Sequence, residues 1–108
     1  MSTVSLMSHT RFVVVGAGAI GGVVGARLVQ GGHDVLLVAR GAHGEAIAER
    51  GLTIEDPAGT ATLGIPVVSD ASEVDYRDGD ITLLCVKTQD TVGALASIRR
   101  GGGAAVPI

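Results

Sequence analysis

Residues 13–21 read VVVGAGAIG, and this stretch decides the fold. Three β-branched residues lead directly into a Gly-x-Gly-x-x-Gly motif, and the apolar residues Ile20, Val24 and Leu28 then recur at four-residue spacing. A β-branched run favours a strand, and four-residue spacing places apolar side chains on one face of a helix. A glycine-rich turn between a strand and a helix is typical of dinucleotide-binding βαβ units. Its placement is what makes the motif specific, because the bare pattern is weak evidence in a chain with 17 glycines.

Each glycine of the motif has its own expected task. Gly16 permits the tight turn out of the strand, and Gly18 lets backbone N–H groups approach a diphosphate at the positive end of the helix. Gly21 lets the helix pack closely on the sheet. Gly22 and Gly25 also fall inside the helix, where glycine costs up to ~1 kcal/mol relative to alanine. That cost argues against a merely flexible turn and predicts a helix built for close approach.

Two further apolar runs, at residues 35–39 and 81–86, do not alternate with polar residues. This pattern is typical of parallel strands that are covered on both faces. With a strand at residues 12–15 and a helix at Ala19–Gln30, it predicts an α/β fold with a Rossmann-type, doubly wound, mostly parallel sheet that is incomplete at its C-terminal end. The other expected elements are a helix at residues 44–50, a hairpin of residues 52–55 and 60–63, a short strand at Val67–Val68, a helix at residues 90–99 and the start of a strand at residues 104–108.

The residue that closes the second strand indicates which dinucleotide is bound. It lies about 20 positions past the glycine motif and faces the adenosine ribose, where NAD sites usually place an acidic residue. Here it is Arg40, whose guanidinium suits a 2′-phosphate through charge-assisted hydrogen bonds of roughly 1.5–3 kcal/mol each. We therefore expect NADP(H); the alternative is a solvated surface arginine. Asp34 lies at the other end of this strand and is expected in a loop.

Lys87 follows the third apolar run, at the edge where open α/β sheets bind their ligands. Its position leaves two interpretations open, a ligand-binding group or a surface lysine whose stem covers apolar neighbours. Thr88–Asp90 fit the cap and entry of the following helix. The expected cofactor-binding residues are Gly16, Ala17, Gly18, Ala19, Ile20, Gly21, Arg40 and Lys87.

Composition excludes several classes of function. With 8 Lys+Arg and a net charge of −3, neither nucleic acid nor an anionic membrane surface is expected as a partner. No apolar segment approaches the ~20 residues of a membrane helix. Cys85 is the only cysteine, which rules out an intrachain disulfide and fits a cytoplasmic protein. We expect Cys85 to be inert, and no metal site, because the three histidines lack the spacing of metal ligands.

Three segments resemble the N-terminal domain of ketopantoate reductases, the NADPH-dependent 2-dehydropantoate 2-reductases of pantothenate biosynthesis. They are residues 13–22 (VVVGAGAIGG), 32–40 (GHDVLLVAR) and 84–89 (LCVKTQ). The resemblance runs from about residue 12 to residue 108. Many dehydrogenases share the glycine motif, whereas its combination with Arg40 and with Val86-Lys87-Thr88 is more specific.

The resemblance implies roles for individual residues. Gly16, Gly18 and Gly21 would hold the diphosphate, Arg40 the 2′-phosphate, and Lys87 would lie beside cofactor and substrate. In such enzymes a hydride passes from the nicotinamide to the keto carbon, and a lysine on a separate helical domain acts as the acid. Family members continue, shortly after the position corresponding to residue 108, into a strand that ends in an Asn-Gly pair and then into the helical domain.

From this resemblance we expect a truncated or separately encoded reductase. Residues 1–10 are expected to be a disordered extension and residues 11–108 an NADP-binding domain that binds cofactor without turnover, with no catalytic residue of its own and the helical domain absent. In an assembled enzyme the substrate would be a small keto acid.

Two other functions stay open. One is a non-catalytic module that senses NADP(H), or that associates with a second copy or another chain through the unfinished sheet edge. The other is the cofactor domain of a different dehydrogenase, such as one acting on 2-hydroxy acids or sugar nucleotides, because a fold does not name its substrate.

Overall fold

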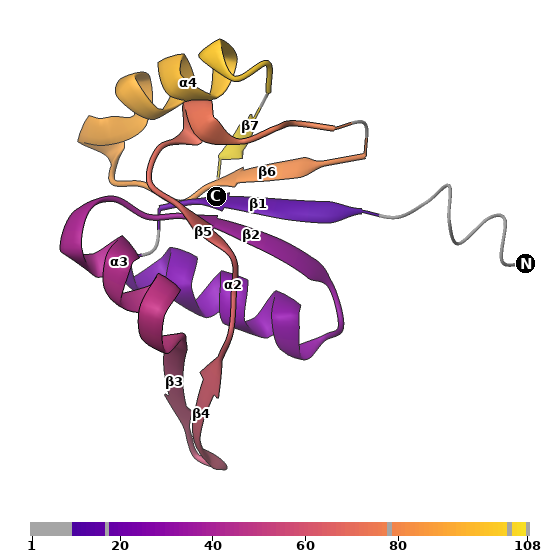
Figure 1. The fold of residues 1–108 in the computed structure, drawn as a ribbon, viewed down its shortest axis with the longest axis vertical. Helices are drawn as coiled ribbons and strands as arrows, with labels where there is room; N and C mark the ends of the chain where they lie inside the picture. Colours follow the sequence, from indigo (N-terminus) through magenta and orange to yellow (C-terminus); the bar gives the residue numbers. More distant parts are fainter. Residues whose placement is uncertain (1–9, 17, 78, 104, 108) are drawn as a thin grey trace, which may run out of the picture.

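The computed structural model describes residues 10–16, 18–77, 79–103 and 105–107, so the expected extension at residues 1–10 lies outside the described residues except for Thr10. In chain order the elements are β1 (Arg11–Val15), α2 (Ala19–Gln30), β2 (Asp34–Val38), α3 (Gly41–Arg50), β3 (Leu52–Asp56), β4 (Gly59–Leu63), β5 (Val67–Val68), the 3₁₀ turn η1 (Ala71–Glu73), β6 (Ile81–Leu84), the 3₁₀ turn η2 (Thr88–Asp90), α4 (Thr91–Arg100) and β7 (Ala105–Pro107). Figure 1 shows helices on both sides of a central sheet.

Five parallel strands form the central sheet, in the order β5-β2-β1-β6-β7. Numbered along the chain, these strands run 3-2-1-4-5, which is the Rossmann order. The chain builds outward from β1 through β2 and β5, and then returns to the other side of β1 with β6. The strand order therefore reverses between β1 and β6, the place where open α/β sheets bind ligands. The expected α/β, Rossmann-type parallel sheet is confirmed.

The two faces of the sheet carry separate apolar cores, because successive residues of a strand point to opposite faces. Val13 and Val15 of β1 pack with Ile98 of α4, whereas Val14 packs with Ile47 of α3. Figure 1 shows α4 above the sheet and α2 and α3 below it. Both faces of the central strands are thus covered, which is why their sequences do not alternate between apolar and polar residues.

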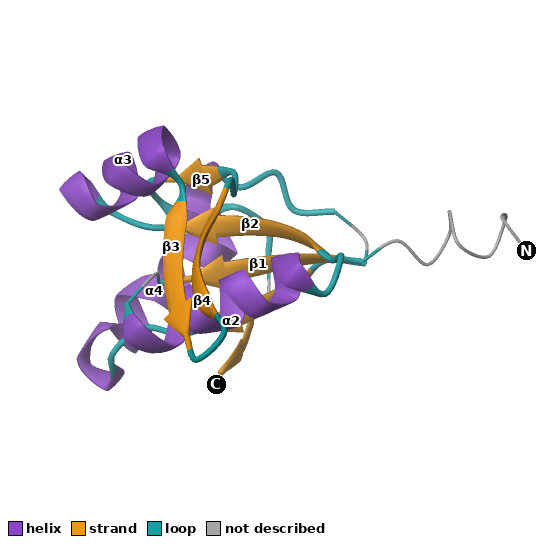
Figure 2. Cartoon of the chain, turned by 90° about the horizontal axis from the view of Figure 1, so that it is seen from below, coloured by secondary structure: helices purple, strands orange, loops and turns teal. Residues whose placement is uncertain are grey.

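The strands β3 and β4 form a separate antiparallel hairpin, as expected from the residues around its turn. It crosses beside α2 at an angle to the central strands (Figure 2). Among the described residues, no helix has the length and apolar character needed to span a membrane.

Several element boundaries differ from those expected. The expectation of Asp34 in a loop is wrong, because Asp34 is the first residue of β2 and pairs with Arg11 of β1. The helix α3 begins three residues earlier than residue 44, because the carbonyl of Arg40 already accepts the first helical hydrogen bond, from Gly44 N–H at 3.4 Å. The strand β6 ends two residues before residue 86, although Cys85 N–H still donates to Val15 O at 2.8 Å. Beyond that bond the chain turns toward α4, so the apolar run continues past the end of the strand.

Candidate functional site

Gly16 begins the turn that leaves β1. Its φ is +102°, in the region that favours glycine, and its N–H donates to Val38 O of the neighbouring strand at 2.9 Å. A Cβ at this position would lie 3.0 Å from Cys85 O and 3.0 Å from a methyl group of Val86. Both the conformation and the space therefore require glycine here, as the motif predicts.

Gly21 brings the first turn of α2 against the loop. A Cβ on Gly21 would lie 1.7 Å from Gly16 O, far inside van der Waals contact. Gly18 differs, since a Cβ there would meet nothing within 4 Å. Gly18 is also the N-cap of α2, and the first turn of this helix carries no acidic residue. The open space above Gly18 thus adjoins a helix N-terminus, which favours an anion.

The structure says less about the other predicted residues of the motif. Ala17 lies outside the described residues. Ala19 and Ile20 begin α2, and the Ile20 side chain is 63% exposed, so any contact with a diphosphate would come from the backbone. At position 25 a larger residue would fit, because a Cβ there would lie 3.7 Å from Leu37 Cδ1, an ordinary contact. The expected close approach therefore holds at Gly21 and is wrong for Gly25.

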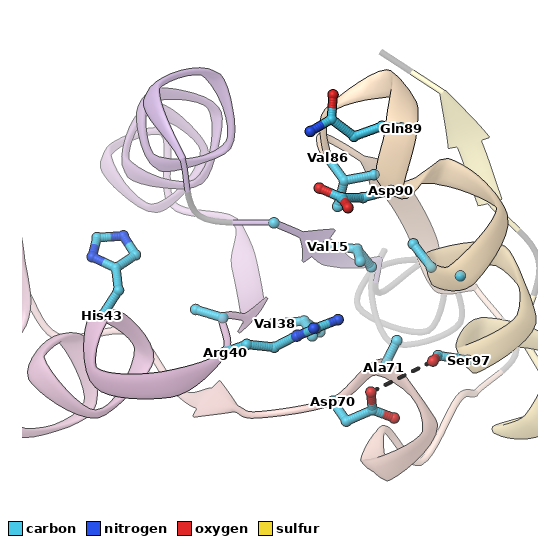
Figure 3. A pocket seen from close by; sticks show the side chains of 14 residues that line it. Val15, Val38, Arg40, His43, Asp70, Ala71, Val86, Gln89, Asp90 and Ser97 are labelled. Atoms are coloured by element: carbon cyan, nitrogen blue, oxygen red, sulfur yellow. Dashed lines mark hydrogen bonds between the residues drawn. The ribbon is translucent and has the colours of Figure 1, made fainter.

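A cavity of about 430 Å³ opens at the carboxyl ends of β1 and β2, between η1 and α4 (Figure 3). Much of its wall is apolar, and its charged side chains come from three separate elements. Its lining residues are Val15, Gly16, Val38, Ala39, Arg40, His43, Asp70, Ala71, Val86, Gln89, Asp90, Gly93, Ala94 and Ser97. The cavity thus joins Gly16, where the glycine turn begins, to Arg40. The space at Gly18 belongs to a neighbouring hollow, and His43 lines both.

Arg40 follows β2 and is the N-cap of α3. Its side chain is exposed, and in Figure 3 it extends from the end of β2 into the cavity. Within the part of the chain that the structure describes, its guanidinium has neither a hydrogen bond nor an ion pair to protein. All of its donors are therefore available to a ligand at the cavity that Arg40 lines.

Asp70 is a half-buried carboxylate on the same cavity, and sequence reasoning missed it. It caps η1: Ser72 N–H donates to Oδ2 at 3.0 Å, and the Ser72 hydroxyl donates to the same oxygen. These bonds, the hydroxyl first, hold the pKa of Asp70 below its ordinary value. Asp70 follows β5 at the sheet edge that Arg40 also occupies, so the strand-end rule that selected Arg40 would also have found it.

Lys87 lies at the expected edge but does not line the cavity. Its side chain is exposed, and its carbonyl accepts the N–H of Asp90 at 2.8 Å, which forms η2. Its neighbours Gln89 and Asp90 line the cavity instead. Asp90 occupies the N-cap position of α4, so the helix begins where it was expected to begin. The Asp90 side chain makes no capping hydrogen bond to the backbone of this helix.

Cys85 lies half-buried directly after β6. Burial raises the pKa of its thiol, which disfavours the reactive thiolate. In the described ranges, no group of three His, Cys, Asp or Glu side chains comes together in a way that would hold a metal ion.

Comparison with known proteins identifies relatives of this chain. The model of the family described as ketopantoate reductase PanE/ApbA matches residues 12–108. A 2-dehydropantoate 2-reductase of Pyrococcus abyssi is 37% identical over 89 residues, which are 82% of this chain and 28% of that protein.

Solved structures agree in both sequence and fold. A PanE/ApbA family ketopantoate reductase from Ralstonia eutropha superimposes with a TM-score of 0.78 at 33% identity, over 90% of this chain and 32% of that one. A D-mandelate dehydrogenase in a ternary structure with NADH and anilino(oxo)acetate gives a TM-score of 0.77 at 28% identity, over 91% and 32%. This chain spans about a third of the length of the proteins it matches.

Proposed function

The chain belongs to the ketopantoate reductase PanE/ApbA family, and from that membership we propose that it binds NADP(H) as the cofactor domain of a reductase acting on 2-dehydropantoate. A Rossmann-type domain of this family implies a nicotinamide cofactor. The observation that carries the choice of NADP(H) is Arg40, which projects into the cavity next to the glycine turn with its guanidinium unpaired in the described structure.

The residues present fit such a cofactor. The space at Gly18 would admit the diphosphate against the N-terminus of α2, since even a methyl group there meets nothing within 4 Å. Arg40 would pair with the 2′-phosphate, and the apolar walls formed by Val15 and Val38 would hold the adenosine. The bound cofactor supplies a hydride; this chain orients the cofactor along the carboxyl edge of the sheet.

We assign no proton donor to the 108 residues, and we propose that by themselves they bind cofactor without turnover. The family resemblance implies that the lysine that acts as the proton donor belongs to a separate helical domain. Lys87 of this chain does not line the cavity. The keto acid is then the substrate of the assembled enzyme, at a site that this domain shares. Ketopantoate-dependent NADPH oxidation by the purified chain would contradict this part of the proposal.

A second candidate is an NADH-dependent dehydrogenase of 2-hydroxy acids. It is favoured by the similarity to D-mandelate dehydrogenase, whose ternary structure contains NADH. The two candidates differ at the ribose, because only NADP(H) carries a 2′-phosphate for Arg40 to bind. Arg40 therefore makes NADP(H) the better supported of the two.

A fluorescence titration with NADPH and with NADH tests the cofactor. The chain contains no Trp, so the protein background is low. We expect NADPH to bind at least tenfold more tightly than NADH, and Arg40→Gln to remove that difference, since charge-assisted hydrogen bonds contribute about 1.5–3 kcal/mol each. Arg50→Gln, at the other end of α3, is the matched control and should leave it intact. Equal affinities in the unmodified chain would favour the second candidate.

A further inference from the structure

Asp70 is fixed at the wall of the cavity by contacts from two elements. It caps η1 through Ser72, and the Ser97 hydroxyl of α4 lies 3.5 Å from its Oδ1 (Figure 3). The Ser97 side chain is itself held by Arg100, whose guanidinium donates to it at 2.9 Å. The carboxylate is therefore oriented before any ligand arrives, with little freedom to turn away.

The two oxygens of Asp70 are not equally occupied. Among the described residues, Ser72 donates twice to Oδ2 and the Glu73 N–H completes the capping box of this carboxylate, whereas Oδ1 receives the long contact from Ser97 at 3.5 Å. A carboxylate can accept about four hydrogen bonds in total. Because Asp70 is ionised, it offers acceptors only, so it favours a ligand group that donates a hydrogen bond at this wall and repels one that carries a lone pair there.

The part of the cofactor that reaches this wall follows from the proposed function, on which this inference rests. Arg40 and the glycine turn fix the 2′-phosphate and the diphosphate at one side of the cavity, which leaves the base for the space between η1 and α4. Ala71 and Ala94 line the cavity there with apolar side chains, against which a ring could pack. Adenine has one exocyclic donor, its amino group. Hypoxanthine, the base of the deaminated cofactor, has a carbonyl oxygen at that position.

We propose that Asp70 is a specificity-determining residue that accepts a hydrogen bond from the adenine amino group and so selects adenine against hypoxanthine. Its role is distinct from that of Arg40: Arg40 selects the phosphate on the ribose, and Asp70 selects the base. Neither residue takes part in hydride transfer, so both act on the affinity for the cofactor.

Calorimetric titration of the whole chain with NADPH and with nicotinamide hypoxanthine dinucleotide phosphate, reduced, tests this proposal. We expect NADPH to bind about tenfold more tightly, which corresponds to roughly 1.4 kcal/mol. Asp70→Asn should bring the ratio to about one, because an amide offers both a donor and an acceptor to the base. Asparagine also serves well as an N-cap, so η1 is retained.

Glu73→Gln is the matched control. Glu73 belongs to the same capping box, accepting the Asp70 N–H at 2.8 Å, but it does not line the cavity. This variant should keep the tenfold preference for NADPH. If Glu73→Gln loses that preference, the effect belongs to the η1 turn as a whole and the role of Asp70 is overturned. Equal binding of both nucleotides by the unmodified chain would overturn the inference while leaving the proposed function standing. Absence of binding by either nucleotide would overturn the proposed function itself.

Discussion

Arg11 and Asp80 form a nearly buried ion pair at the edge of the sheet opposite the cavity. Their side chains are 11% and 6% exposed, and the contact is bidentate, with Nε–Oδ1 at 3.1 Å and Nη2–Oδ2 at 2.6 Å. The same guanidinium donates to Asp75 O at 2.9 Å, and Arg77 N–H donates to Asp80 Oδ2 at 2.9 Å. The pair thus ties the start of β1 to the loop that precedes β6.

This pair makes stability depend on pH in a defined direction. Burial opposes ionisation of Asp80 and is the largest single effect, but the bonds from Arg11 and from Arg77 N–H together outweigh it, so the pKa of Asp80 lies below its ordinary value. A lowered carboxyl pKa contributes stability that is present above the ordinary carboxyl pKa of about 4 and is lost as the pH falls through the lower, folded value.

We therefore expect Asp80→Asn to lower the free energy of unfolding by about 2 kcal/mol at pH 7, since it leaves Arg11 nearly buried without its counter-charge. The difference from the unmodified chain should shrink as the pH falls below the ordinary carboxyl pKa of about 4 and through the lower pKa of folded Asp80. Urea unfolding followed by circular dichroism at pH 7, 5 and 3 measures this. A difference that is the same at all three pH values would contradict the assigned role of the charge.

For single residues, the sequence predicted which ones lie at strand ends better than it predicted which side chains line the cavity. Gly16 and Arg40 were predicted because each lies at a strand end with a residue type that suits one part of a dinucleotide. Asp70 was missed although its short strand, Val67–Val68, was expected, because ligand-binding positions were predicted only at the ends of the longer strands. Lys87 was left open between two interpretations, and only the path of η2 shows that its neighbours, not its own side chain, line the cavity.

Among elements, α2 contains glycines with opposite requirements. Gly21→Ala would place a methyl group 1.7 Å from Gly16 O, a backbone atom that cannot move without opening the turn. We expect this change to destabilise the chain by several kcal/mol, as overpacking against fixed atoms does, and to abolish nucleotide binding. Gly25→Ala adds an ordinary contact with Leu37 and should stabilise the helix by up to ~1 kcal/mol.

Thermal unfolding of the two variants, with and without NADPH, separates these effects. Gly18→Ala completes the set, because a methyl group there meets no protein atom within 4 Å but enters the space proposed for the diphosphate. It should unfold like the unmodified chain and bind NADPH more weakly. Normal binding by Gly21→Ala would contradict the close packing of α2, and normal binding by Gly18→Ala would contradict the place assigned to the diphosphate.

The centres of the elements were predictable from apolar periodicity, whereas their ends were not. Periodicity reports which side chains are buried, and Cys85 and Val86 remain partly buried after the ladder of β6 has ended. The start of α3 depends on the carbonyl of Arg40, a backbone contact that no side-chain pattern encodes. Local backbone hydrogen bonds therefore determine where a helix or strand ends, whereas burial of side chains determines the sequence pattern along its centre.

For the whole molecule, the parallel sheet followed from a few strong rules, because a strand, a glycine turn and a crossover helix leave little choice of topology. The cavity was not predictable in the same way. It depends on how η1 and α4 approach one another, through a contact between Asp70 and Ser97 that are 27 positions apart in sequence. That contact holds Asp70 on the wall of a cavity that Arg40 lines from the end of β2, and we propose that this cavity receives the adenosine part of the cofactor.

Under the proposed binding mode, the two halves of the cofactor contribute unequally to the stability of the folded chain. A ligand that binds only the folded state raises its stability by RT ln(1 + [L]/Kd), about 2.7 kcal/mol at 100 times Kd, and 1 kcal/mol shifts the melting temperature of a domain this size by roughly 4–8 °C. Because the cavity and Arg40 both lie at the adenosine end, adenosine 2′,5′-bisphosphate should give at least half the shift that NADPH gives at the same concentration. Nicotinamide mononucleotide should give almost none. A larger shift from the mononucleotide would place the main binding surface elsewhere on the sheet edge, away from Arg40.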